Sequence, residues 1–246
     1  MKINVIFSHH NYDELFFASK TSVVIDVLRA SSTIVTALQN GAKEIIPVAS
    51  VEFAVKISGG LFTGQTLLCG ERNTKKIEGF ALGNSPLEFT EDKIGGKSII
   101  LYTTNGSKAI VKAKFSGNLF ITTFLNLSTV AKKLVEIEKD TEIICSGRGN
   151  AISLEDIVCA GKLVSEIQKY KEEIELSDSS KASISLNKSF GKNVHKMLKE
   201  TEHGQILIEN GFEKDIEYCS KLDLLEAVPV FTNNALRLLS AVKPVV

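Results

Sequence analysis

Short apolar runs alternate along this chain with longer segments of helical periodicity. Runs rich in Val, Ile and Leu predict buried strands over residues 3–7, 23–27, 44–48, 67–69, 98–102, 119–122 and 142–145. Apolar residues spaced three or four apart predict helices over residues 31–40, 51–58, 107–115, 128–138 and 153–169. Strands that alternate with helices in this way are typical of an α/β fold with a mainly parallel or mixed sheet.

The pattern changes in the last third of the chain. Residues 172–185 are polar and rich in serine, which predicts an exposed connector. A helical pattern follows over residues 186–222, with Gly204 and Gly211 as breaks. We interpret the whole chain, 1–246, as one α/β domain whose C-terminal part is helical, with residues 186–222 as a candidate subdomain.

A last strand is predicted over residues 228–231, where Val and Phe dominate. Pro229 lies inside this run, and proline has no backbone N–H to donate to a neighbouring strand. The sequence therefore predicts that this strand occupies an edge of the sheet, where a missing hydrogen-bond donor costs nothing.

Composition and charge narrow the functional classes. The 246 residues carry 29 basic and 29 acidic side chains, so nothing in the net charge predicts a nucleic-acid or membrane partner. The first residues lack a secretory apolar region and no apolar stretch approaches about 18 residues, so we expect a cytoplasmic chain without membrane spans. Four cysteines without CxxC spacing predict buried, reduced thiols.

The first candidate loop follows the strand over residues 23–27. Asp26 ends the apolar part of that strand, and Arg29 comes three residues later. Strands of a parallel sheet deliver their loops to the carboxyl edge, where α/β proteins bind ligands. There a carboxylate can hold Mg²⁺, and an arginine can bind a phosphate, sulfonate or carboxylate with two hydrogen bonds. The structural alternative is an Asp26–Arg29 ion pair that only shapes the loop.

The second candidate loop is the string Thr-Thr-Asn-Gly-Ser over residues 103–107. Its hydroxyls, its carboxamide and the N-terminus of the following helix can all donate hydrogen bonds to an anion. Gly106 would let the backbone approach a ligand closely. The alternative is an N-cap combined with an Asn-Gly turn, which would be purely structural.

Acidic and basic residues also occur together in two further loops. Residues 145–156 carry Arg148 and the adjacent acids Glu155 and Asp156, although Ser153 and Asp156 also fit a structural capping box. The long polar loop over residues 69–89 contains Glu71-Arg72 and, in a turn, Asn84-Ser85. A long polar loop in a compact domain is often a lid or a binding loop.

Several familiar catalytic motifs are absent from the sequence. It contains no Walker P-loop, no C-x₅-R phosphatase loop, no GxSxG elbow and no HExxH string. The four histidines have no metal-site spacing, so we interpret them as exposed or capping residues.

Six strings taken together carry a family resemblance. In chain order they are DVLRASST, GER, LGNSP, TTNGS, CSG…SLED and a tail with GFEKDIEYC…LD…VPV, spanning about Val23 to Val230. In this order they resemble the 2-phosphosulfolactate phosphatase family. The resemblance implies a three-layer α/β/α fold and Mg²⁺-dependent hydrolysis of 2-phospho-3-sulfolactate to 3-sulfolactate and phosphate, a step of coenzyme M biosynthesis. Asn73 and Ala81 depart from the residues that the family often has, Gly and Asp.

This mechanism assigns roles to the loop residues. The carboxylates expected to hold Mg²⁺ and act in catalysis are Asp26, Glu71 and Asp156, with Glu155 as an alternate ligand or general base. The arginines expected to bind the anionic groups of the substrate are Arg29, Arg72 and Arg148. The remaining residues expected to bind substrate are Asn84, Ser85, Thr104, Asn105, Gly106 and Ser107.

Two rival functions remain open at this point. One is a phosphatase of the same fold that acts on another small phosphorylated acid, and the other is a non-catalytic module that binds an anionic metabolite. Carboxylates around an anion site would repel the ligand without a metal, which favours the enzyme. Attack by water and a phosphoaspartyl intermediate on Asp26 both stay open. The expected partners are a small anionic substrate and, in a homodimer, a second copy of the chain.

Overall fold

The structure, a computed structural model, describes residues 1–59 and 65–239. Its strands are β1 (Lys2–Ile6), β2 (Thr21–Ile25), β3 (Glu44–Val48), β4 (Thr66–Arg72), β5 (Lys75–Lys76), β6 (Ser98–Tyr102), β7 (Asn118–Thr122), β8 (Thr141–Cys145), β9 (Glu175–Leu176), β10 (Pro229–Thr232) and β11 (Ala235–Leu238). Its α-helices are α1 (Ala30–Gln39), α2 (Val51–Ser58), α3 (Glu91–Ile94), α4 (Gly106–Lys112), α5 (Leu127–Ile137), α6 (Leu154–Tyr170), α7 (Asp178–Phe190), α8 (Val194–Glu200), α9 (Glu202–Glu209) and α10 (Glu213–Cys219). Short 3₁₀ helices are η1 (Glu14–Phe17), η2 (Pro86–Glu88) and η3 (Phe124–Asn126).

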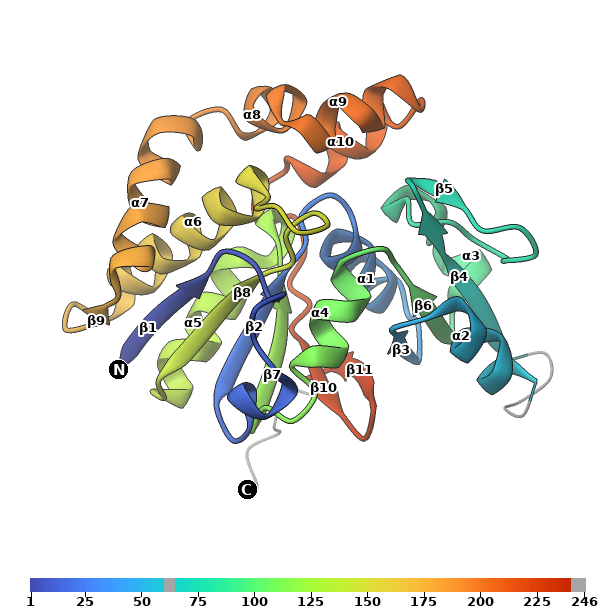
Figure 1. The fold of residues 1–246 in the computed structure, drawn as a ribbon, viewed down its shortest axis with the longest axis horizontal. Helices are drawn as coiled ribbons and strands as arrows, with labels where there is room; N and C mark the ends of the chain where they lie inside the picture. Colours follow the sequence, from blue (N-terminus) through green and yellow to red (C-terminus); the bar gives the residue numbers. More distant parts are fainter. Residues whose placement is uncertain (60–64, 240–246) are drawn as a thin grey trace.

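These strands form one mixed sheet in the order β5-β4-β6-β3-β11-β10-β7-β2-β8-β1-β9. Strands β7, β2, β8, β1 and β9 pair in parallel, as do β3, β6 and β4. The antiparallel hairpin β10–β11 joins these two groups (Figure 1). The predicted α/β class with a mainly parallel or mixed sheet is therefore confirmed.

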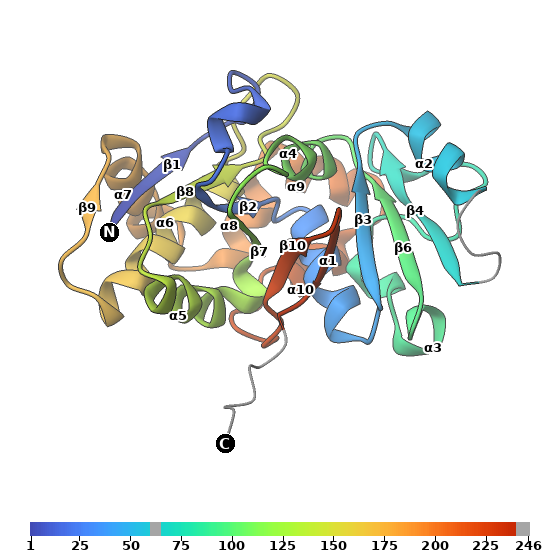
Figure 2. The ribbon, with the colours of Figure 1, turned by 90° about the horizontal axis from the view of Figure 1, so that it is seen from below.

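Helices cover both faces of the sheet, because the central strands are apolar on both sides. Along β2, Val23 and Ile25 belong to a core with α5 and α6, whereas Val24 faces a second core that contains residues of α1 and α4. Successive side chains of a strand point to opposite faces, so a continuous apolar run produces this arrangement. Figure 2 shows α2 and α4 on one side of the sheet and α3 and α5 on the other.

Most predicted elements lie within two residues of their observed ends, and the ranges 44–48, 51–58 and 98–102 agree fully with β3, α2 and β6. The predicted edge strand is wrong, because β10 lies inside the sheet between β7 and β11. Pro229 is tolerated there because it is the first residue of the strand, and β10 pairs with β7 only through Val230. The partner strand β11 was not predicted.

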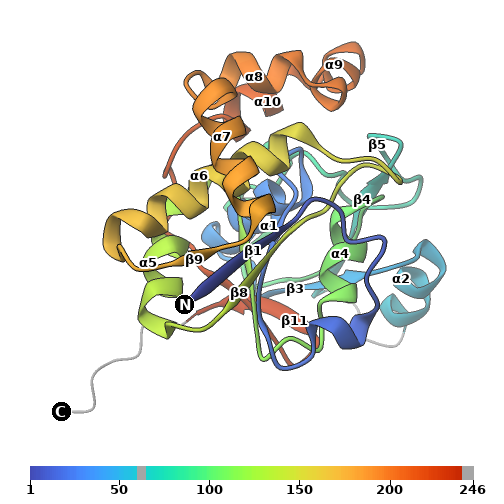
Figure 3. The ribbon, with the colours of Figure 1, turned by 60° about the vertical axis from the view of Figure 1, so that its left-hand side comes forward.

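The predicted exposed connector over residues 172–185 is also wrong. It contains β9 and most of α7, which lies against α6 (Figure 3). Two of its serines, Ser180 and Ser183, are fully buried, and the Ser180 hydroxyl donates to the Ile3 carbonyl oxygen at 2.9 Å. The polar composition here reflects close helix packing, because small side chains let two helix backbones approach.

Helices α8, α9 and α10 form a roof over the sheet, beyond the point where β2 and β8 end (Figure 1). Gly211, with a φ of +83°, separates α9 from α10 as predicted, whereas Gly204 lies within α9 and is not a break. Leu207 and Ile216 belong to the same core as residues of α5 and α6. The candidate subdomain 186–222 stays a prediction, as does the single domain 1–246, part of which lies outside the described residues.

The four cysteines are buried and free, as expected for reduced thiols. Burial raises the pKa of Cys69 and of Cys219 to about 12, so neither is a reactive thiolate at neutral pH. Among the described residues, no helix combines the length and apolarity that crossing a membrane requires.

The contact between α6 and α7 gives a first prediction. A Cβ on Gly161 would lie 2.0 Å from the Ser183 carbonyl oxygen. We therefore expect Gly161→Ala to lower the free energy of unfolding by about 1–3 kcal/mol, measured by urea denaturation. Gly59→Ala is the matched control, because its nearest atom outside the adjacent residues lies 3.9 Å away. Equal unfolding midpoints for the two variants would contradict this packing.

Candidate active site

A cavity of about 400 Å³ lies at the carboxyl ends of β2, β4, β6 and β8, under helix α9. The predicted site residues that line it are Asp26, Arg29, Glu71, Asn84, Thr104, Asn105 and Arg148. Predicted site residues outside its lining are Arg72, Ser85, Gly106, Ser107, Glu155 and Asp156. Sequence reasoning missed several lining residues, among them Asn73, Thr74, Thr103, Glu202, His203 and Ile206.

Asp26 is one of two buried carboxylates of the cavity lining, and it has 7% of its surface exposed, the same fraction as Glu71. Its Oδ1 accepts a hydrogen bond from the Ala30 backbone N–H at 3.1 Å. Burial raises the pKa of Asp26 to about 6, and the nearby Glu71 carboxylate acts in the same direction. A Cβ on Gly106 would lie 2.4 Å from Asp26 Oδ2, so the glycine makes room for this carboxylate beneath α4.

Asp156 lies behind Asp26, at the start of α6. Its Oδ1 accepts from the Val27 N–H at 2.9 Å and its Oδ2 from the Ser146 hydroxyl at 3.0 Å. Burial raises the pKa of Asp156, and the carboxylates of Asp26 and Glu155 raise it further. The capping-box alternative is wrong, because the Ser153 side chain makes no cap hydrogen bond. The metal-binding role of Asp156 stays a prediction.

Glu71 connects two loops of the cavity wall. Its Oε1 accepts from the Thr104 N–H at 2.7 Å, and its Oε2 accepts from the Thr74 N–H at 2.8 Å. The two-residue turn between β4 and β5 consists of Asn73 and Thr74, whose φ angles are +52° and +69°. Such a tight hairpin turn requires positive φ at both positions, which explains why Gly or Asn suits residue 73. Arg72, on the last position of β4, is exposed.

Three buried side-chain oxygens in the cavity wall have no hydrogen-bond partner among the described residues. They are Thr74 Oγ1, Asn84 Oδ1 and Thr104 Oγ1. Buried polar atoms in native proteins are nearly always paired, and leaving one unpaired costs about 1–3 kcal/mol. These oxygens are fully buried, so a ligand in the cavity can pair with one only after its side chain turns toward the cavity.

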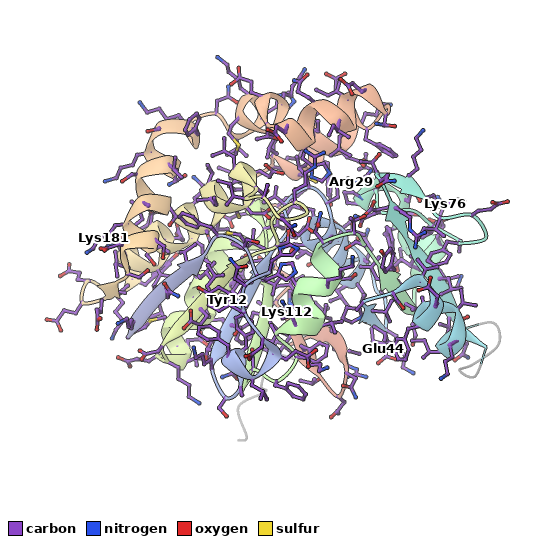
Figure 4. The ribbon with its side chains drawn as sticks, viewed as in Figure 1. Tyr12, Arg29, Glu44, Lys76, Lys112 and Lys181 are labelled. Carbon is purple, nitrogen blue, oxygen red and sulfur yellow. The ribbon has the colours of Figure 1, made fainter. Side chains whose placement is uncertain are left out.

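Arg29 is engaged within the protein. Its Nη1 donates to Asp215 Oδ2 at 2.7 Å, and its Nη2 donates to the Thr74 carbonyl oxygen at 2.8 Å. The ring of Phe212 stacks on the guanidinium at 4.0 Å. Figure 4 shows Arg29 between the helical roof and the β4–β5 turn. The alternative of an Asp26–Arg29 ion pair is wrong, because the partner of Arg29 is Asp215.

The second loop is held by reciprocal hydrogen bonds. The Ser107 hydroxyl accepts from the Thr103 N–H at 2.9 Å, and Thr103 Oγ1 accepts from the Ser107 N–H at 2.9 Å. These contacts give Ser107 a structural role at the start of α4. Asn105 Oδ1 accepts from the Gly149 N–H at 3.1 Å and so ties this loop to the one that carries Arg148.

Helix α9 supplies two ionisable side chains that the sequence did not indicate. Glu202 pairs with Arg148 at 3.3 Å, and His203 Nδ1 lies 3.6 Å from Glu155 Oε1. The interpretation of all four histidines as exposed or capping is wrong for two of them. His203 lines the cavity, and His9 is buried with its Nδ1 at 2.8 Å from the Ser146 carbonyl oxygen. Burial lowers the pKa of His9 to about 4.

Comparison with known proteins places this geometry in a family. Residues 8–234 match the model of the 2-phosphosulpholactate phosphatase family. The chain belongs to the 2-phosphosulfolactate phosphatase family. The resemblance identified from the six strings is thereby confirmed.

Relatives in this family match the chain over most of its length, and each carries the name probable 2-phosphosulfolactate phosphatase. The protein of Caldanaerobacter subterraneus subsp. tengcongensis is 40% identical, over 94% of this chain and 95% of its own length. That of Clostridium novyi is 41% identical, over 94% and 97%. That of Thermotoga maritima is 43% identical, over 87% and 90%.

The cavity of this 2-phosphosulfolactate phosphatase family member offers oxygen ligands for a hard cation. No three His, Cys, Asp or Glu side chains of residues 1–59 and 65–239 converge as a complete metal cage. Mg²⁺ does not need one, because it commonly binds through one or two carboxylates together with water and substrate phosphate. Asp26 and Glu71 both line the cavity, and two carboxylates with water and phosphate form a donor set that fits Mg²⁺.

Asp26→Asn tests the buried carboxylate. We expect kcat to fall at least about 100-fold, the scale of one key electrostatic contact. In metal-free buffer at pH 7.5 the variant should unfold at a higher temperature, because an ionised buried acid is removed. The pKa of Asp26 is raised to about 6 in the folded state, so this stability gain should shrink as the pH falls through 6. Near-normal turnover, or a gain that does not depend on pH, would contradict the assignment.

Thr74→Gly tests the unpaired hydroxyl in the strained turn. A β-branched residue at a φ of +69° is strained, so glycine should raise the melting temperature while it removes Oγ1 from the cavity. We expect kcat/KM to fall about tenfold, the cost of one lost hydrogen bond. Asn234→Gly is the matched control, because Asn234 has a φ of +60° in the β10–β11 turn and does not line the cavity. An unchanged kcat/KM in Thr74→Gly would exclude a ligand contact there.

Proposed function

We propose that this protein is a Mg²⁺-dependent phosphatase that hydrolyses 2-phospho-3-sulfolactate to 3-sulfolactate and phosphate. The observation that carries the proposal is the group of three unpaired oxygens, Thr74 Oγ1, Asn84 Oδ1 and Thr104 Oγ1, in one cavity with buried carboxylates. Membership of a family whose relatives carry the phosphatase name supports the reaction class.

The charges around the cavity support a requirement for a metal. Asp215 neutralises Arg29, and Glu202 faces Arg148, so both arginines already have acidic partners. Asp26 and Glu71 add further negative charge to the lining. A substrate with three anionic groups would be repelled by this arrangement unless a cation bound with it. When bound at Asp26 and Glu71, Mg²⁺ supplies charge neutralisation for the phosphate and lowers the pKa of a bound water.

The side chains of the cavity bind and orient the substrate. Phosphoryl transfer depends mainly on positioning and charge stabilisation, because the protein does little covalent chemistry. The hydroxyl of Thr104 donates to a phosphate oxygen. Arg148, on the half-exposed rim of the cavity, binds the sulfonate or carboxylate of the substrate in place of Glu202. The Arg148–Glu202 ion pair is weak and easily exchanged, because the Glu202 side chain is 91% exposed. Helix α9 contributes Glu202, His203 and Ile206 to the cavity lining.

The metal requirement is tested by removal and return. EDTA-treated enzyme should release no phosphate from 2-phosphosulfolactate, and added Mg²⁺ should restore the rate, because only a cation balances the carboxylates of the cavity. Oxygen-only ligands should make Mg²⁺ more effective than Zn²⁺. Full activity in a preparation shown by elemental analysis to be free of metal would exclude this part of the proposal.

Substrate charge is tested by removal of the sulfonate. We expect kcat/KM for 2-phospholactate to be about ten- to a hundredfold below that for 2-phosphosulfolactate, because each lost charged hydrogen bond costs about 1.5–3 kcal/mol. Arg148→Ala should narrow this preference. Arg237→Ala is the control, because Arg237 lies on β11 and pairs with Glu44. Equal values for the two substrates would favour a phosphatase for another small phosphorylated acid.

A further inference from the structure

One buried carboxylate of the roof, Asp215 on α10, connects the roof to two loops below it. Its side chain is 3% exposed. Its Oδ2 accepts from Arg29 Nη1 at 2.7 Å, and its Oδ1 accepts from the Ser85 hydroxyl at 2.6 Å. Both carboxylate oxygens are therefore used, by two loops that are far apart in the sequence.

Each of these two hydrogen bonds leads to an unpaired oxygen of the cavity. The second terminal nitrogen of Arg29, Nη2, donates to the carbonyl oxygen of Thr74 at 2.8 Å. Ser85 directly follows Asn84, whose carbonyl oxygen accepts from the Thr33 hydroxyl at 2.9 Å. Thr74 and Asn84 are two of the three residues whose side-chain oxygens lack partners in the cavity wall.

Stability alone does not account for this arrangement. Burying an ion pair costs desolvation of both charges, and an apolar replacement of similar volume is often as stable. What the pair provides is a fixed geometry, since the guanidinium is held in its plane by Asp215, the Thr74 carbonyl and the Phe212 ring together.

We propose that Asp215 is a positioning residue of the active site. It acts through Arg29 and Ser85 to hold Thr74 and Asn84 in position in the wall of the substrate cavity. Asp215 itself does not line the cavity. The inference rests on the proposed function for the identity of the substrate, and it assigns Arg29 to the support of the wall.

Asp215→Asn is the main test, because asparagine has the same shape and can still accept from Ser85 while it loses the charge that pairs with Arg29. We expect kcat/KM for 2-phosphosulfolactate to fall at least about tenfold, mostly through a higher KM. The matched control is Asp223→Asn, because Asp223 Oδ2 also accepts a serine hydroxyl at 2.6 Å, but from Ser128, which does not line the cavity as Arg29 does. The control should keep the wild-type kcat/KM.

A double-mutant cycle separates positioning from a structural role. In a Thr74→Ala/Asn84→Ala background, Asp215→Asn should lower kcat/KM by less than about threefold, because the groups that it positions are gone. A full tenfold loss in that background, or a lowered melting temperature with unchanged KM and kcat in the single variant, would overturn the proposal. Ser85→Ala removes one of the two hydrogen bonds of Asp215 and should also raise KM. This variant keeps the proposal testable if Asp215→Asn does not fold.

Hydrogen exchange provides a readout that does not depend on the substrate. The Thr74 amide, which donates to Glu71 Oε2 at 2.8 Å, should exchange faster in Asp215→Asn, while amides of β2 keep their protection. If the wild type releases no phosphate from 2-phosphosulfolactate, the proposed function fails and this exchange result decides the role of Asp215 alone. Unchanged exchange at Thr74 would overturn the positioning role.

Discussion

The buried ion pair between Arg29 and Asp215 joins the sheet of this protein to its helical roof. Arg29 is the last residue of the loop between β2 and α1, so the pair sets the position of α10 relative to the carboxyl end of the sheet. Helix α9, which precedes α10, then lies over the cavity with Glu202 and His203 in its wall. The buried Arg29 guanidinium therefore fixes the relative positions of three segments: the helical roof, the β4–β5 turn and the loop between β2 and α1.

Negative charge is the second constraint on the site. Burial raises the pKa of both Asp26 and Asp156, and the Asp26 carboxylate raises the pKa of Asp156 further. A protein gains no stability from such an arrangement. A cation and an anionic ligand that complete the site would account for these buried carboxylates at the carboxyl ends of the strands. The carboxylates and the unpaired oxygens therefore support the same proposal.

Sequence reasoning predicted what depends on local patterns. Apolar runs located β2, β3, β6 and β8, and residues at their ends include Asp26, Thr104 and Arg148, which all line the cavity. Contacts between distant segments had no such signal. Arg29 and Asp215 are 186 residues apart, so no local pattern could predict their ion pair. His203 lies on α9, whose sequence pattern predicts a helix with an apolar face but not its position over the cavity. The serines of α7 were misinterpreted because burial by close helix packing leaves the same composition as an exposed connector.

The central claim is that the cavity under α9 binds the phosphorylated acid and the cation together. A crystal structure with Mg²⁺, 3-sulfolactate and phosphate, the proposed products, tests it most directly. The account predicts phosphate oxygens within hydrogen-bond distance of Thr104 Oγ1, and a cation between the phosphate and the carboxylates of Asp26 and Glu71. Products bound elsewhere, or a cavity in which Thr74, Asn84 and Thr104 remain unpaired with ligand present, would contradict it.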